Sequence, residues 1–243
     1  MNESVRPAAP QAPERLPQLT AVMPAYNEQE VLPLALEEAV AALPEVADEW
    51  ELVVVDDGST DRTPAILAEW AAREPRLRIL TQRPNQGYSR ALARGFREAR
   101  YPAIFYTDAD AQFDLTEIRR LAPHLAAHDM VAGYRLARQD PWIRLLTSRT
   151  YNLLQGLVLG IRVRDVNCAF KLFRRSFFEK VELRSDGFLI DAELYARARR
   201  AGLTWTQVGV THRPRAAGST TVKASTVTST LRELLQLRRD LDS

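Results

Sequence analysis

The sequence has little of what defines several large classes of protein. It contains a single cysteine, Cys168, so no intramolecular disulfide can form, and this composition fits a reducing compartment. Its longest apolar-leaning run, residues 153–161, is interrupted by one glutamine and two glycines, whereas a membrane-spanning helix needs about 20 apolar residues. The first 18 residues have no apolar core of the kind found in signal peptides. We therefore expect a cytoplasmic protein whose contact with any membrane is peripheral.

Two glycine-rich motifs that bind phosphate groups are also absent. Neither the G-x-G-x-x-G turn of dinucleotide-binding domains nor the G-x-x-x-x-G-K-[ST] loop occurs in the chain. A phosphate ligand must then be bound in another way, and at an acidic site this requires a bridging cation.

Charge is distributed unevenly along the chain. The formal net charge is +2, but residues 135–184 contain eleven Lys/Arg against four Asp/Glu, a local balance of +7. Such a segment is expected to face an anionic partner, such as phosphate groups or a membrane, although a solvated basic face would read the same way. Because the rest of the chain places acidic residues at its strand ends, we expect no nucleic-acid partner.

Apolar runs alternate with amphipathic stretches of helical length. Residues 1–18 are rich in proline and are expected to be a disordered tail. Short β-type runs follow, with helical patterns between them, at residues 19–23, 52–55, 77–80, 103–106 and 129–135. This alternation predicts βαβ units and a doubly wound, mostly parallel sheet in the α/β class.

Polar clusters follow three of these runs, at residues 26–28, 56–59 and 108–112. Ligands of open α/β sheets bind beyond the carboxyl ends of the strands, so we expect the three clusters to share one sheet edge. In the third cluster, Asp108, Asp110 and the amide of Gln112 could converge on a hard cation such as Mg²⁺ or Mn²⁺. The alternative is a solvated turn that Asp114 caps.

Four motifs, in order along the chain, carry a family resemblance: P-A-Y-N-E at 24–28, V-D-D-G-S-T-D at 55–61, N-Q-G at 85–87 and D-A-D-A-Q at 108–112. Together they resemble the family 2 glycosyltransferases with a GT-A fold, and within that family the dolichyl- or polyprenyl-phosphate sugar synthases. The resemblance covers about residues 19–223. It implies one GT-A (Rossmann-like) domain over that range, followed by a C-terminal amphipathic helix at 224–243.

The resemblance also implies roles for the strand-end residues. The nucleotide would be bound by six residues: Pro24, Ala25, Tyr26, Glu28, Asp56 and Asp108. The metal, Mg²⁺ or Mn²⁺, would be bound by Asp108, Asp110 and Gln112. For Asp57 and Ser59, by contrast, turn and capping chemistry is the expected role.

The second half of the chain supplies the residues that the resemblance places near the acceptor and the donor phosphates. The block at 165–171 is similar to the family's D-x-x-[SC]-[GA]-F-[RK] motif, and in it Asp165 is either an orienting group or a modest base. Stabilisation of phosphate charge is expected from three basic residues: Arg135, Lys171 and Arg215. His212 and Ser219 are expected contacts of the donor or acceptor phosphate, and whether Lys223 joins them is left open.

The resemblance implies a metal-dependent, inverting transfer of a hexose from a nucleotide sugar, of the GDP-mannose or UDP-glucose type, to a polyprenyl or dolichyl phosphate. One alternative is a family 2 enzyme with a saccharide or other soluble hydroxyl acceptor, and another is a non-catalytic nucleotide-sugar-binding protein. The sequence does not identify the sugar, the nucleotide or the oligomeric state. For residues 142–160 it leaves core packing and an interfacial position open. For residues 225–241, whose apolar face includes Leu234, Leu235 and Leu241, it leaves domain packing, dimerisation and membrane contact open.

Overall fold

The computed structural model describes residues 15–136, 152, 154–185, 189–214 and 234–241. The strands are β1 (Leu16–Ala25), β2 (Ala47–Asp56), β3 (Leu77–Thr81), β4 (Ala103–Thr107), β5 (Met130–Leu136), β6 (Phe170–Arg174) and β7 (Trp205–Thr211). The α-helices are α1 (Leu32–Val46), α2 (Thr63–Ala71), α3 (Tyr88–Glu98), α4 (Ile118–Leu121), α6 (Phe177–Lys180) and α7 (Ile190–Arg200), and the 3-10 helices are η1 (Leu115–Glu117) and η2 (Ala122–Ala126).

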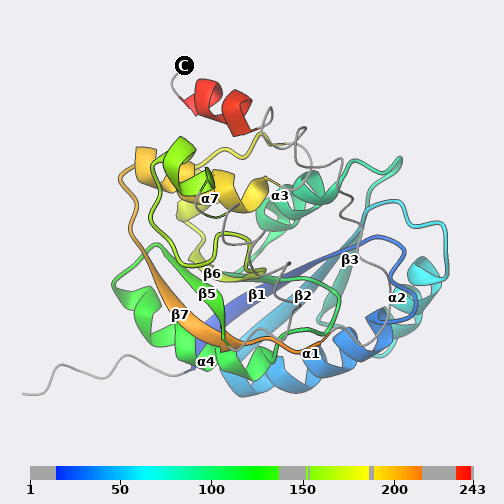
Figure 1. The fold of residues 1–243 in the computed structure, drawn as a ribbon. Helices are drawn as coiled ribbons and strands as arrows, with labels where there is room; N and C mark the ends of the chain where they lie inside the picture. The colour runs from blue at the N-terminus through cyan, green and yellow to red at the C-terminus, as the bar shows by residue number, and fades with distance from the viewer. Residues whose placement is uncertain (1–14, 137–151, 153, 186–188, 215–233, 242–243) are drawn as a thin grey trace, which may run out of the picture.

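These strands form one sheet in the order β3-β2-β1-β4-β6-β5-β7 (Figure 1). All neighbouring pairs are parallel except the two that include β6, which runs antiparallel to β4 and β5. Helices α3 and α7 cover one face of the sheet, and α1, α2 and α4 cover the other. The predicted single α/β domain with a mostly parallel sheet is confirmed, and its parallel strands all end at the same edge.

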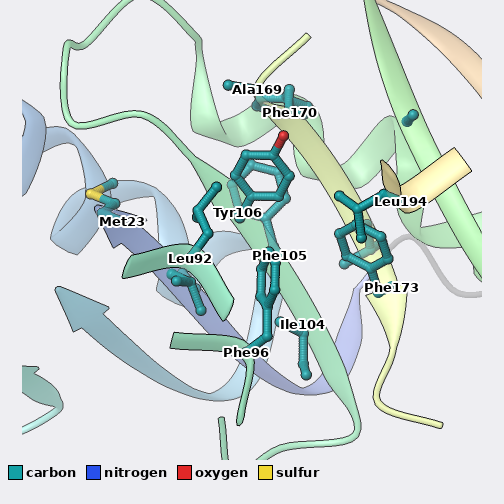
Figure 2. Packing of buried hydrophobic residues seen from close by; sticks show 14 of the residues in the cluster. Met23, Leu92, Phe96, Ile104, Phe105, Tyr106, Ala169, Phe170, Phe173 and Leu194 are labelled. Carbon is teal, nitrogen blue, oxygen red and sulfur yellow. The ribbon is translucent and has the colours of Figure 1, made fainter. Parts of the chain in front are cut away.

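The core explains why the central strands are almost entirely apolar. The β2 residues Leu52 to Val55 are fully buried, because helices lie on both faces of the sheet. Where β4 meets β6, aromatic side chains replace the aliphatic ones (Figure 2). The rings of Phe105 and Phe170 lie 4.6 Å apart, centroid to centroid, in a T-shaped arrangement, and Phe96 of α3 packs edge-on against Tyr106 at 5.6 Å.

The start of the fold differs from the prediction that the tail extends to residue 18. Strand β1 begins at Leu16, which pairs with Ala47 of β2. The guanidinium group of Arg15 explains the earlier start, because it donates to the carbonyl oxygens of Pro44, Glu45 and Ala47 at 2.7–2.9 Å. The predicted boundary at 18/19 is therefore wrong, and the rest of the predicted tail, residues 1–14, lies outside the described residues.

Residues 234–241 of the C-terminal segment are helical. Leu234, Leu237 and Leu241 are buried, and the guanidinium group of Arg238 donates to the carbonyl oxygen of Val158 at 3.1 Å. Leu235, expected on the same apolar face, is 46% exposed, so its assignment was wrong. The described helix therefore packs on the domain. Among the described helices none has the length and apolar character needed to cross a bilayer.

Candidate active site

The carboxyl ends of β2, β1 and β4 lie side by side, and each continues into a polar loop. The register places Ala25 at the end of β1 beside Asp56 at the end of β2, and Val22 beside Tyr106 of β4. Glu28 of the first loop lies close enough to Asp108 of the third for its negative charge to contribute to the raised pKa of Asp108. The prediction that the three polar clusters share one sheet edge is confirmed.

Side-chain to backbone hydrogen bonds hold the first loop against the second. The backbone N–H of Asn27 donates to Ser59 Oγ at 3.0 Å, and the N–H of Thr60 donates to Asn27 Oδ1 at 2.8 Å. The N–H of Glu28 donates to Thr63 Oγ1 at 2.9 Å. Tyr26 remains 48% exposed beside them. These hydrogen bonds join the two loops, residues 26–28 and 56–63, into one surface that we call the wall, and the ring of Tyr26 is exposed to solvent beside it.

The two adjacent carboxylates at the end of β2 have different surroundings. Asp56 is buried, and its Oδ1 accepts from the N–H of Ser59 at 3.0 Å. The carboxylate of Asp57 accepts from the N–H groups of Gln86 and Gly87 and from Gln82 Nε2, each at 2.8 Å. These contacts confirm that Asp57 and Ser59 organise turns, as the sequence predicted.

Gly58 is required for the approach of these two turns. Its φ is +77°, and a Cβ atom at this position would lie 2.9 Å from the backbone nitrogen of Asn85. We expect Gly58→Ala to lower the free energy of unfolding by about 1–3 kcal/mol, measured by urea denaturation, because strain and overlap add. Gly202→Ala is the matched control, since Gly202 has a φ of +67° but no atom within 4 Å of its Cβ position. Equal losses in the two variants would contradict the role of close packing.

The motif after β4 places two carboxylates close together. Asp110 is 9% exposed, and Asp108 Oδ1 accepts from the hydroxyl of Tyr88 at 2.8 Å. Burial raises the pKa of Asp108 to about 7, and the negative charge of Asp110 adds to this effect. A left-handed φ of +54° at Ala111 turns the chain after the pair, and the N–H of Gln112 donates to Asp110 Oδ1 at 3.2 Å.

The end of β7 lies against this motif. Phe113 forms an isolated β-bridge with His212, and their rings lie 5.1 Å apart. Gln112 accepts a backbone hydrogen bond from Arg213 at 2.8 Å and donates from its side-chain Nε2 to the Arg213 carbonyl oxygen at 3.0 Å. With Nε2 so engaged, the amide oxygen of Gln112 is the atom left to act as a ligand. His212 therefore lies beside the acidic motif, and its contact with a phosphate stays a prediction.

The chemistry of these donors fits a hard cation. The half-buried carboxylate of Asp108 and the buried carboxylate of Asp110 lie close enough for their negative charges to interact, so a divalent ion that neutralises them would stabilise both, and an amide oxygen is a further ligand of the same hardness. Among the described residues, no group of three or more His, Cys, Asp or Glu could hold a metal. An ion at Asp108 and Asp110 would accordingly take its remaining ligands from Gln112, water and the substrate.

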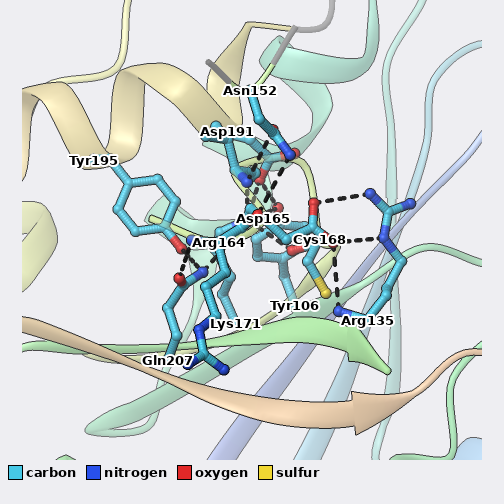
Figure 3. A network of polar contacts seen from close by, with 11 residues as sticks. Tyr106, Arg135, Asn152, Arg164, Asp165, Cys168, Lys171, Asp191, Tyr195 and Gln207 are labelled. Carbon is cyan, nitrogen blue, oxygen red and sulfur yellow. Dashed lines mark hydrogen bonds and ion pairs between the residues drawn. The ribbon is translucent and has the colours of Figure 1, made fainter. Parts of the chain in front are cut away.

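Near the carboxyl end of β5, Arg135 forms a bidentate ion pair with Asp165, which lies in the segment before β6 (Figure 3). Arg135 Nε and Nη2 donate to the two carboxylate oxygens of Asp165 at 2.7 and 2.9 Å. Burial alone would raise the pKa of Asp165, but the hydrogen bonds and charge of Arg135 outweigh it and hold the pKa below its usual range. A carboxylate with a lowered pKa is a weak base. Of the two roles that the sequence left open for Asp165, orienting group or base, the geometry therefore favours the orienting group.

The side chain of Lys171 lies in the interior of the domain, where it cannot contact a bound phosphate directly. Its side chain is fully buried, and Nζ donates to Asp191 Oδ1 at 2.5 Å and to the carbonyl oxygens of Cys168 and Val166 at 2.7 and 3.0 Å. Nζ also lies 3.3 Å from the hydroxyl of Tyr106. The structure corrects the expected position, because the ammonium group is saturated by internal partners rather than directed to the open edge.

Comparison with known proteins decides the family. Residues 20–182 match the family model described as Glycosyl transferase family 2, which is more than half of the chain. The chain belongs to glycosyl transferase family 2. The family resemblance read from the four sequence motifs is thereby confirmed.

Within this family the chain is similar to enzymes named for polyprenyl-phosphate substrates. It is 36% identical over 160 residues to the undecaprenyl-phosphate 4-deoxy-4-formamido-L-arabinose transferase of Pectobacterium carotovorum, which covers 65% of this chain and 49% of the relative. It is 30% identical over 219 residues to the polyprenol monophosphomannose synthase of Mycolicibacterium smegmatis, which covers 85% of this chain and 81% of that relative. The chain thus spans about half the length of the first relative and most of the second.

A solved structure supports the architecture. Glucosyl-3-phosphoglycerate synthase from Mycobacterium tuberculosis superposes with a TM-score of 0.70 at 18% identity, covering 93% of this chain and 80% of that one. At this identity the likeness establishes the GT-A-like fold alone.

Some predicted site residues of this family 2 domain lie outside the described residues, namely Arg215, Ser219 and Lys223, together with residues 142–151. Conversely, sequence reasoning missed Tyr88, whose hydroxyl binds Asp108, and Gln207, which contacts the backbone beside Asp165. Tyr88 directly follows the N-Q-G motif, and this position was the available signal. Gln207 lies in a strand whose sequence gives no sign of its contact.

Proposed function

We propose that this protein transfers a hexose from a nucleotide sugar to a polyprenyl phosphate, with inversion at the anomeric carbon. The names of the relatives, which include a polyprenol monophosphomannose synthase and undecaprenyl-phosphate sugar transferases, support this class of acceptor. The acidic donor edge and the guanidinium group of Arg135, which Asp165 orients, support a reaction between two phosphate-bearing substrates. The expected cytoplasmic location, with peripheral contact to the membrane that holds the lipid, belongs to the same proposal.

The donor nucleotide binds along the wall formed by the first two loops. Asp56 accepts a hydrogen bond from an N–H group of the base, and Glu28 accepts from a ribose hydroxyl. Tyr26 packs its exposed ring on the nucleoside, and Pro24 and Ala25 supply the floor at the end of β1. Asp108, fixed by Tyr88, faces the ribose and the diphosphate. Either GDP or UDP is compatible with these groups.

Asp108, Asp110 and the amide oxygen of Gln112 would hold Mg²⁺ or Mn²⁺ against the donor diphosphate. The ion supplies Lewis-acid neutralisation of the leaving diphosphate. The protein's contribution is to keep two carboxylates at one point and to place His212 next to them, so that charge on the leaving group meets preorganised partners. Arg215 and Ser219 are proposed to act in the same region.

One observation carries the choice of acceptor: Asp165 is engaged by Arg135 and has a lowered pKa. A hydroxyl acceptor needs a base to remove its proton, and an ion-paired carboxylate is poorly suited to that task. A phosphate monoester has a second pKa near 6 and is already largely dianionic at neutral pH. It needs a cation for docking, and the guanidinium group of Arg135, oriented by Asp165, provides one.

In the reaction, a phosphate oxygen of the acceptor forms a bond with the anomeric carbon of the sugar. The bond between that carbon and the diphosphate oxygen breaks, and the nucleoside diphosphate leaves with the electron pair. No proton is removed in this step. A saccharide acceptor would require a proton acceptor at this point, and a non-catalytic binding protein would not need an oriented cation beside the acidic pair.

The proposal is tested by incubating the protein with radiolabelled GDP-mannose or UDP-glucose, Mn²⁺ and polyprenyl phosphate. Label that moves into the organic phase after solvent extraction supports the proposal. Label that moves only onto a soluble saccharide supports the hydroxyl-acceptor alternative. Donor binding with neither product nor donor hydrolysis supports a binding protein.

The raised pKa of Asp108 predicts that metal binding depends on pH. Because the pKa is about 7 in the folded protein, Asp108 is largely protonated at pH 6 and must lose its proton before it can bind a cation. We expect the apparent affinity for Mn²⁺ to weaken by up to about tenfold per pH unit below 7, and to level off above pH 8. Titration of free Mn²⁺ by electron paramagnetic resonance measures this. Affinity that is constant from pH 6 to 8 would contradict it.

A further inference from the structure

The segment that carries Asp165 has no regular secondary structure. Residues 161–169 connect the helix at 154–159 to β6 through bends and turns. Buried backbone groups in such a segment require hydrogen-bond partners from elsewhere, because no helix or strand ladder supplies them. Those partners therefore decide where the side chain of Asp165 points.

Gln207 of β7 binds the first part of this segment with both ends of its amide (Figure 3). Its Oε1 accepts from the N–H of Arg164 at 2.6 Å, and its Nε2 donates to the carbonyl oxygen of Asp165 at 3.1 Å. The same Nε2 lies 3.3 Å from the hydroxyl of Tyr195 in α7. The amide thus binds the peptide group before Arg164 and the peptide group after Asp165, so it holds these two residues from both sides, and Tyr195 contacts the amide in turn.

Lys171 of β6 binds the second part. Its ammonium group donates to the carbonyl oxygens of Val166 and Cys168, and its charge is balanced by Asp191 at the start of α7. Asp191 also accepts a short hydrogen bond from the hydroxyl of Tyr106. Tyr106 lies in β4, two residues before Asp108, so this buried group connects the acceptor side to the strand that carries the metal motif.

We propose that Gln207 and Lys171 together form a clamp on residues 164–168, and that both are positioning residues for the Arg135–Asp165 pair. The clamp holds the backbone of Asp165 so that its two oxygens face Nε and Nη2 of Arg135. Arg135 is in turn held in the orientation that receives an acceptor phosphate. The expected effect on acceptor kinetics rests on the proposed function, but the clamp itself does not depend on the proposed function.

Gln207→Leu is the variant that tests the clamp, because it removes both polar ends of the amide and leaves an apolar side chain that is one atom shorter. A displacement of about 1 Å in a positioning group can cost about 10²-fold in rate, so we expect kcat/KM for the acceptor to fall 10- to 100-fold. The KM for the donor should stay within about twofold of wild type, since Gln207 binds Arg164, Asp165 and Tyr195 rather than the residues proposed to bind the nucleotide. Lys171→Met removes a fully buried charge and is expected to unfold too readily to serve as the primary variant.

A double-variant cycle separates positioning from general damage. If Gln207 acts through Asp165, then Gln207→Leu should change acceptor kcat/KM by less than about twofold in an Asp165→Asn background. Thr204→Val is the matched control: it removes hydroxyl contacts to Asp129 just before the start of β7, three residues before Gln207, and those contacts do not involve residues 164–168. The control should leave acceptor kinetics unchanged. An equal loss in both backgrounds, or no loss at all, would overturn the inference.

The single cysteine gives a measurement that needs no activity. Cys168 is fully buried, and its carbonyl oxygen is one of the groups that the clamp binds. We expect its thiol to react with a disulfide reagent at least tenfold faster in Gln207→Leu than in wild type, and at the wild-type rate in Thr204→Val. An unchanged rate in Gln207→Leu would overturn the clamp. Wild-type protein that transfers no sugar to polyprenyl phosphate would instead overturn the proposed function, and the thiol rates would still decide on the clamp.

Discussion

Asp110→Ala is expected to reduce transfer at least about 10³-fold while leaving the fold intact. The carboxylate is buried at the donor edge, and losing it removes a ligand from the cation that we propose to neutralise the leaving diphosphate. This loss of rate corresponds to several kcal/mol of transition-state stabilisation, because each 1.4 kcal/mol of activation free energy changes the rate about tenfold. The change also removes a like charge beside Asp108, so the thermal unfolding midpoint should stay the same or rise. Steady-state transfer assays and thermal unfolding measure the two effects.

Asp114→Ala is the matched control for this variant. Asp114 lies four residues further on, caps η1 by accepting from the N–H of Thr116 at 3.0 Å, and lies 3.4 Å from the guanidinium group of Arg213. Its loss should cost about 1 kcal/mol of stability and leave transfer close to wild type. Full activity of Asp110→Ala in the presence of EDTA would show that the acidic motif has no catalytic metal.

Arg135→Met is expected to have the second large effect, on both stability and acceptor use. It leaves the buried carboxylate of Asp165 without its counter-charge, which costs about 3–5 kcal/mol of unfolding free energy. It also removes the cation proposed to dock the acceptor phosphate, so acceptor kcat/KM should fall about 10²- to 10³-fold. Arg135→Lys keeps the charge but loses the bidentate geometry, and an intermediate loss is expected. Urea denaturation and acceptor titrations measure the two effects.

Two further variants separate these effects. Asp165→Asn added to Arg135→Met should recover part of the stability without recovering activity, because the uncompensated charge is gone but the docking cation is still missing. Arg174→Met, in the same basic segment, loses a hydrogen bond to the carbonyl oxygen of Leu125 at the other end of the sheet, and its acceptor kinetics should be unchanged. If Arg135→Met and Arg174→Met lowered acceptor use equally, general positive charge would explain the effect and docking by Arg135 would not.

The sequence was sufficient to predict the sheet and its functional edge. The apolar run at residues 52–55 indicates a strand buried on both faces, and the polar clusters at 56–59 and 108–112 directly follow strands. These features are local in the chain, and parallel topology alone brings their ends together. The turn role of Asp57 was also predicted, but the groups that its carboxylate binds, in Gln82, Gln86 and Gly87, lie 25–30 residues further along the chain and could not be.

Contacts between distant parts of the chain could not be predicted. Lys171 was expected at the phosphates because its charge suits them, but the strand alternation turns it inward to Asp191. Gln207 acts on Arg164 and Asp165 from more than 40 residues away, and nothing in its neighbours in sequence marks it. Likewise, Leu235 has the same residue type as its buried neighbour Leu234, and only the packed helix distinguishes them.

The central claim is that the acceptor is a preformed phosphate dianion docked by Arg135, so that no base is needed. It is tested most directly by comparing polyprenyl phosphate with the corresponding polyprenol as acceptors for the same labelled donor, in wild type and Arg135→Met. We expect wild type to move label into the organic phase with polyprenyl phosphate, the variant to lose about 10²-fold or more of this transfer, and neither protein to transfer label to polyprenol. Comparable transfer to polyprenol by wild type would contradict it.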